Sequence, residues 1–168
     1  DENGHGTHVA GIAAAVQDNG VGISGVAQAQ IMALKVTEGD SDEISDLAII
    51  EAYEYIYDAM DAGVNVCAVN CSWGGSADTN GILSLAVDIV GGMGALSVFA
   101  AGNDHVNWDN TRKALTTPYD LDSPYVVIVG ASNEDDAAAY YSDYSASKVD
   151  LFAPGSNMLS TYVEDLYI

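Results

Sequence analysis

Two histidines near the start of the chain stand in a pattern that could support chemistry. Residues Gly4 to Gly11 read G-H-G-T-H-V-A-G, which places His5 and His8 three residues apart at the start of an expected helix. The pair could face one metal ion, or one of them could serve as a general base. Both could equally be ordinary capping or packing residues.

Metal catalysis has little further support in this sequence. A catalytic zinc ion takes three protein ligands, and the chain has a single further histidine, His105. It also lacks the C-x-x-C and H-E-x-x-H patterns. The choice between a base and a packing pair therefore depends on the rest of the chain.

The elements that would position these residues alternate between helices and apolar strands. Alternation of this kind is typical of an α/β fold with a mostly parallel sheet, whose sites lie at the carboxyl ends of the strands. That edge would carry residues 72–75 and 102–103. We expect Asp40 and Glu43 to cap the second helix and Gly63 to end it. The expected helices are 8–16, 42–62 and 81–90, and the expected strands are 29–36, 64–71, 95–101 and 126–131.

The strand expected at residues 64–71 has few polar side chains, which predicts cover on both faces. It contains both cysteines, Cys67 and Cys71. Four residues of strand separate their Cα atoms by about 13 Å, and a disulfide needs less than about 7 Å. We expect two free thiols that act as small buried hydrophobic residues.

The chain is strongly acidic, with 25 Asp and Glu against 4 Lys and Arg and a formal net charge of -21 over 168 residues. Such a charge repels nucleic acid and anionic membranes, so neither is an expected partner. The apolar fraction of 49% is enough for a packed core.

Six further motifs follow the histidine segment along the chain: S-G-V-A at 24–27, V-N-C-S-W-G-G at 69–75, A-A-G-N at 100–103, S-P-Y-V-V-I-V-G-A at 123–131, Y-S-D-Y-S at 141–145 and A-P-G at 153–155. Together with the histidine segment they resemble the motifs of the subtilisin-like serine proteases, in the order that this family follows. The resemblance implies a three-layer α/β/α fold, of which residues 1–168 form a partial peptidase domain. One departure is Gln28, which stands where the family usually has proline.

The resemblance also implies a role for each matching residue. His5 matches the catalytic base, and His8 matches a structural histidine of the family. Asn103 matches the oxyanion-hole residue, whose amide donates to the developing negative oxygen. The remaining matches bind substrate: Ser72, Trp73 and Gly74 pair with the substrate backbone, and Ala100, Ala101 and Gly102 line the primary specificity pocket.

The other two members of the family's triad find no match in this sequence. The family order is Asp, His, Ser, with the aspartate upstream of the histidine motif and the serine in a G-T-S-M-A-type segment after A-P-G. We therefore expect an internal fragment, truncated at both ends and inactive alone, of a secreted and monomeric endopeptidase that acts on proteins or peptides. The alternative is a relative that has lost catalysis and acts as a binding module.

The loop at residues 17–22 is a candidate calcium site, as it is in many members of the family. Asp18 and Asn19 supply suitable oxygen ligands. A plain Asn-Gly turn explains the same residues. The chemistry itself requires no cofactor.

Overall fold

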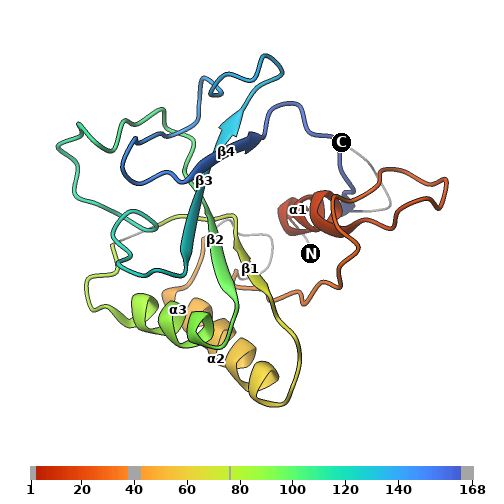
Figure 1. Ribbon diagram of the computed structural model, residues 1–168, viewed down its shortest axis with the longest axis horizontal. Coiled ribbons are helices and arrows are strands. Elements are labelled where there is room, and N and C mark those ends of the chain that lie inside the picture. Colours follow the sequence, from red (N-terminus) through yellow and green to blue (C-terminus); the bar gives the residue numbers. More distant parts are fainter. Residues whose placement is uncertain (1–2, 38–42, 76, 164–168) are drawn as a thin grey trace. The chain divides into compact units, whose positions relative to one another are not determined.

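The computed structural model describes residues 3–37, 43–75 and 77–163 (Figure 1). They divide into two compact units. The first comprises Asp1–Ala52 with Asn157–Ile168, and the second comprises Tyr53–Ser156. The expectation that the chain belongs to a single peptidase domain stays a prediction. None of the helices in the described residues is long and apolar enough to cross a membrane.

A four-stranded parallel sheet forms the centre of the second unit. Its strands lie in the order in which they follow one another in the sequence. The α/β class with a parallel sheet is therefore confirmed, and the carboxyl ends of all four strands share one edge (Figure 1). The strands are β1 (Ala68–Cys71), β2 (Leu96–Ala100), β3 (Val126–Ser132) and β4 (Leu151–Pro154).

One face of the sheet is covered by helices. α3 (Ile82–Gly92) buries a stripe of apolar residues at helical spacing, which includes Leu83, Val87 and Val90. Tyr53, from α2 (Asp46–Asp61), places its hydroxyl 2.9 Å from the Ser97 hydroxyl on β2. The side chains of β2 that point to this face are fully buried, because the helices exclude water from them.

The opposite face of the sheet is more open. Leu96 is 43% exposed and Leu151 is 48% exposed. β1 is also largely exposed, so the prediction of a strand covered on both faces is wrong for the described structure. We call the side chains of Leu96, Val98, Val129 and Leu151 the open face.

The two cysteines differ more than expected. Both are free thiols, as predicted. Cys67 precedes β1 and is exposed, whereas Cys71 ends β1 and is buried. Burial raises the pKa of the Cys71 thiol to about 11, although its hydrogen bond with Tyr53 lowers the pKa in part. Only Cys71 behaves as a small buried hydrophobic residue.

In the first unit, α1 (His5–Ala14) begins three residues before the predicted helix. The side chain of Asn3 explains the earlier start, since its Oδ1 accepts the N–H of His5 at 3.1 Å. Gly4, in the left-handed conformation, occupies the N-cap position. His5 therefore lies in the first turn of the helix.

The S-G-V-A segment satisfies the last carbonyl groups of α1. A helix leaves its final carbonyl groups without partners inside the helix. Here the N–H groups of Gly25, Val26 and Ala27 donate to the carbonyl oxygens of Ala15, Ile12 and Ala13 at 2.9–3.0 Å. A Cβ at position 25 would collide with the backbone of Ala14 and Ala15. Local packing thus requires glycine there.

The strand predicted at residues 29–36 is absent, and this prediction is wrong. An apolar extended segment becomes a strand only when another strand pairs with its backbone, and residues 29–36 take part in no described strand pairing. Only an isolated bridge, between Thr37 and Ile44, follows them. Conversely, β4 was not predicted as a strand. Its four residues include a proline, which is uncommon within a paired strand.

The second helix begins later than predicted and ends as predicted. α2 starts at Asp46, so Glu43 lies outside it, and Asp40 is not among the described residues. At its end, the N–H groups of Gly63 and Val64 donate to the carbonyl oxygens of Met60 and Ala59. This is a Schellman motif, and Gly63 adopts the positive φ of 93° that the motif requires.

Candidate active site

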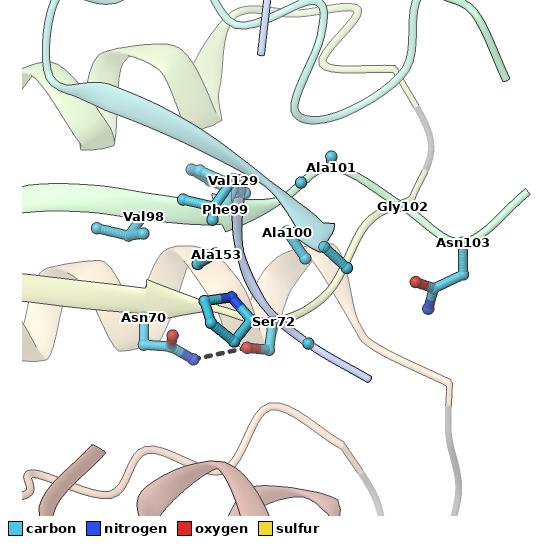
Figure 2. A pocket seen from close by; sticks show the side chains of 14 residues that line it. Asn70, Ser72, Val98, Phe99, Ala100, Ala101, Gly102, Asn103, Val129 and Ala153 are labelled. Atoms are coloured by element: carbon cyan, nitrogen blue, oxygen red, sulfur yellow. Dashed lines mark hydrogen bonds between the residues drawn. The ribbon is translucent and has the colours of Figure 1, made fainter. Parts of the chain in front are cut away.

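A cavity of about 300 Å³ lies at the carboxyl edge of the sheet (Figure 2). It collects residues from the ends of all four strands, as expected for a parallel sheet. Five of the predicted site residues line it together: Ser72, Ala100, Ala101, Gly102 and Asn103. The other lining residues are Asn70, Val98, Phe99, Val129, Gly130, Ala131, Ala153, Pro154 and Gly155.

Small side chains keep the cavity open. Half of its lining residues are alanine or glycine, which project little into the space. At Gly130 a Cβ would collide with the ring of Phe152, and at Gly155 it would lie 2.8 Å from the Cβ of Ala131.

Asn103 lies at the rim of this cavity with its side chain exposed (Figure 2). Its amide makes no hydrogen bond within the described part of the chain. The two N–H groups of this amide are therefore available to a ligand. Gly102, just before it, has a φ of 113°, a conformation that favours glycine.

The backbone that leads to Asn103 is fixed by buried contacts. The N–H of Ala101 donates to the carbonyl of Val129 at 2.9 Å, and the hydroxyl of Tyr119 donates to the carbonyl of Ala101 at 2.7 Å. Burial, and then the nearby Asp143 carboxylate, raises the pKa of Tyr119 well above its usual value. Tyr119 therefore stays protonated, and able to donate this hydrogen bond, well above neutral pH. The indole of Trp108 stacks on its ring at a centroid distance of 4.4 Å.

Ser72, Trp73 and Gly74 follow the end of β1. The amide of Asn70 donates to the hydroxyl of Ser72 at 2.9 Å (Figure 2). Trp73 packs edge-on against Phe99 with ring centroids 5.3 Å apart. Neither Trp73 nor Gly74 lines the cavity. Within the described sheet β1 has one neighbour, β2. The role of these three residues stays a prediction.

The remaining predicted residues belong to the first unit. The His5 side chain is exposed at the start of α1. The carbonyl of His8 accepts a hydrogen bond from the Ser160 hydroxyl at 2.6 Å. Asp18 and Asn19 are both exposed, and the Asn19 side chain accepts the N–H of Val21 at 2.9 Å.

The calcium prediction concerns the turn at Asp18 and Asn19. The two side chains offer fewer oxygen ligands than the six to eight that calcium takes. The described residues also contain no group of three or more His, Cys, Asp or Glu side chains that could hold a metal ion. The calcium site at Asp18 and Asn19 therefore stays a prediction that would need further ligands.

Sequence reasoning missed the residues that hold the Asn103 turn. Tyr119, Trp108 and Asp143 lie 16, 5 and 40 positions away from Asn103 in the sequence. The sequence analysis identified Asp143 only as part of the Y-S-D-Y-S motif and assigned it no role. The sequence offers one signal for Asp143: it is an acidic residue that lies between aromatic residues, in a segment whose composition does not otherwise predict burial.

Comparisons with known proteins agree on one family. The sequence matches the profile of the subtilase family over residues 1–167. It is 38% identical over 170 residues to the minor extracellular protease Epr of Bacillus subtilis, and this alignment covers 99% of this chain and 24% of Epr. It is 36% identical over 166 residues to thermitase of Thermoactinomyces vulgaris, and this alignment covers 98% of this chain and 54% of thermitase.

Solved structures show the same likeness. The S41 psychrophilic protease superimposes with a TM-score of 0.82 at 30% identity, over 100% of this chain and 57% of that one. Sphericase gives the same TM-score and coverage, also at 30% identity. The chain thus spans from about a quarter to somewhat over half of the length of these relatives.

Proposed function

The chain belongs to the subtilase family, and on that basis we propose that the whole protein is a serine endopeptidase. The observation that carries the proposal is the exposed, unbonded amide of Asn103 at the rim of a cavity lined by small residues. An amide whose backbone is held in place but which makes no internal hydrogen bond can donate to an oxygen that gains charge during reaction.

In the proposed mechanism, His5 removes the proton from the nucleophilic serine of the whole protein. The serine oxygen attacks the peptide carbonyl carbon, and the carbonyl oxygen becomes an oxyanion. Asn103 donates to this oxyanion and stabilises it more strongly than the neutral carbonyl, so the hydrogen bond lowers the barrier. His5 then returns the proton to the leaving amine.

Substrate selection follows from the shape of the cavity and from charge. We assign the cavity to one large apolar side chain of the substrate. Ala100, Ala101 and Gly102 line it with small, apolar groups that leave space for such a side chain. Ser72, Trp73 and Gly74 would pair with the substrate backbone. The net charge of -21 favours neutral or basic peptides over acidic ones. Secretion agrees with the extracellular proteases among the relatives.

Asn103→Ala tests the central role. We expect kcat to fall by about 10²–10³-fold with little change in KM, which is the loss found when a subtilisin loses its oxyanion-hole asparagine. Asn110→Ala, at an exposed asparagine that follows in the sequence, is the matched control and should leave kcat unchanged. Rates are measured on the whole protein and divided by the active-site titre. An unchanged kcat for Asn103→Ala would remove this residue from the mechanism.

The fragment itself provides a second test. We propose that residues 1–168 alone are inactive, since no residue in them matches the family's serine or aspartate. A fluorophosphonate probe should label the whole protein and leave the fragment unlabelled. Failure to label the whole protein would favour the non-catalytic binding module.

A further inference from the structure

The turn that carries Asn103 is held on both sides by one buried residue, Asp143, which is 3% exposed and contributes both its backbone and its carboxylate. The N–H of Asp143 donates to the carbonyl of Gly102 at 2.9 Å. Its carboxylate oxygen Oδ1 accepts the N–H of Asp104, also at 2.9 Å. These two groups belong to the peptide bonds immediately before and after Asn103. Asp143 therefore fixes both peptide groups that flank the residue.

Further contacts of the same carboxylate extend this support. Oδ1 also accepts the N–H of Val106 at 2.9 Å, and Oδ2 accepts the indole N–H of Trp108 at 3.0 Å. Trp108 in turn stacks on Tyr119, whose hydroxyl donates to the carbonyl of Ala101. The residues before and after Asn103 are thus tied into one connected network.

The conformation of Gly102 completes the arrangement. A Cβ at this position would lie 2.6 Å from Oδ2 of Asp143, which is closer than such atoms approach one another. Glycine at position 102 is therefore required both by its positive φ and by the approach of the carboxylate. The glycine of A-A-G-N thus leaves the space that the carboxylate of the Y-S-D-Y-S aspartate occupies.

Burial of a carboxylate is costly unless its charge is compensated. No lysine or arginine pairs with Asp143 in the described part of the chain, and three N–H donors provide the compensation instead. Hydrogen bonds to a charged acceptor are stronger than those to a neutral one. An ionised aspartate is thus suited to hold a turn rigidly, which is what an oxyanion donor needs in order to act without reorganisation.

We propose that Asp143 is a positioning residue for the reaction, which sets the location of the Asn103 amide without touching the substrate. The inference rests on the proposed function, because it assigns to Asp143 an effect that acts through the oxyanion donor. A misplacement of about 1 Å can cost about 10²-fold in rate. Loss of Asp143 should therefore lower kcat by up to that factor and leave KM nearly unchanged.

A double-mutant cycle tests the route of the effect. In the whole protein, Asp143→Ala should lower kcat per titrated active site. In an Asn103→Ala background it should change kcat by less than twofold, since the group that it positions is gone. If the two losses multiply, or if Asp143→Ala alone leaves kcat within twofold of the wild type, the inference is wrong. Asp109→Asn is the matched control, because this exposed carboxylate binds residues 145–147 and not the Asn103 turn.

A gentler substitution covers the case in which Asp143→Ala does not fold. Asp143→Asn keeps an oxygen for the two backbone N–H groups but turns an NH₂ group toward the indole N–H of Trp108, so two donors face each other. Trp108→Phe removes one of them and keeps a ring against Tyr119. The double variant Asp143→Asn/Trp108→Phe should then have a severalfold higher kcat than Asp143→Asn. No recovery would overturn the inference.

The two failures can be told apart. If the whole protein is not labelled by a fluorophosphonate and Asn103→Ala has no effect on kcat, the proposed function fails and the inference fails with it. If Asn103→Ala lowers kcat as expected and the Asp143 variants do not, the proposed function stands and the role of Asp143 is overturned.

Discussion

The buried hydrogen bond between Tyr119 and Ala101 allows a quantitative prediction about stability. Tyr119→Phe removes the hydroxyl that donates to the Ala101 carbonyl at 2.7 Å, and both residues are 3% exposed. Water cannot easily take the place of the lost donor. A buried acceptor that loses its partner costs about 1–3 kcal/mol. We therefore expect the free energy of unfolding to fall by about that amount.

The chain contains a matched control for this substitution. The hydroxyl of Tyr141 donates to the carbonyl of Gly155 at 2.8 Å, which is the same chemistry at an exposed site. In Tyr141→Phe, water can bond to the carbonyl. The expected cost is about 0.5 kcal/mol or less, as for an ordinary surface substitution.

Urea denaturation of the whole protein, with autolysis blocked by a sulfonyl fluoride, measures both costs. The thermal midpoint should follow, at about 2–4 °C for each kcal/mol in a domain of this size. Equal losses for the two variants, or a larger loss for Tyr141→Phe, would refute the argument that burial of the Ala101 carbonyl decides the cost.

Three further predictions concern thiols, pH and solubility. Cys67 is exposed and should react rapidly with a thiol reagent in the native protein. Cys71 should react only after unfolding, because it is buried and burial raises its pKa to about 11. Reaction of both thiols in the native protein would contradict this prediction. Hydrogen bonds from Ser147, Ala146 and Ser145 lower the pKa of Asp109 from 3.8 to about 2, so its contribution to stability is present above pH 3.8 and is lost as the pH falls toward 2. The stability difference between the wild type and Asp109→Asn should shrink over that window, and a difference that is independent of pH would exclude this linkage. The isolated 168-residue chain should aggregate or remain molten, because its open face exposes apolar side chains; a sharp cooperative melt with a well-dispersed amide NMR spectrum would show the reverse.

Local patterns in the sequence determined a large part of this description. The strands at 95–101 and 126–131 could be predicted because a continuous apolar run is typical of a buried parallel strand, and β2 and β3 match them closely. The end of α2 could be predicted because a Schellman motif needs a residue such as Gly63 at one position in the chain. The match to the family likewise depended on short segments in which residue type and spacing are read directly.

Other features depended on partners that are distant in the sequence. Residues 29–36 have the composition of a strand, but pairing decides whether a strand forms, and no pairing partner is present in the described structure. The sequence identified Gly25 only as part of the S-G-V-A motif, and the constraint on it is the backbone of Ala14 and Ala15. Neither fact is visible in a local window of sequence.

The environment of Asn103 shows the same division most clearly. The sequence alone, through the A-A-G-N motif, was enough to identify Asn103 as a candidate oxyanion donor. Only the tertiary structure showed that Asp143 bonds to the peptide groups on both sides of Asn103, and that Gly102 is needed where the carboxylate approaches. Hydrogen bonds between segments 40 residues apart depend on how the chain folds back on itself, whereas motif spacing depends only on the order of residues.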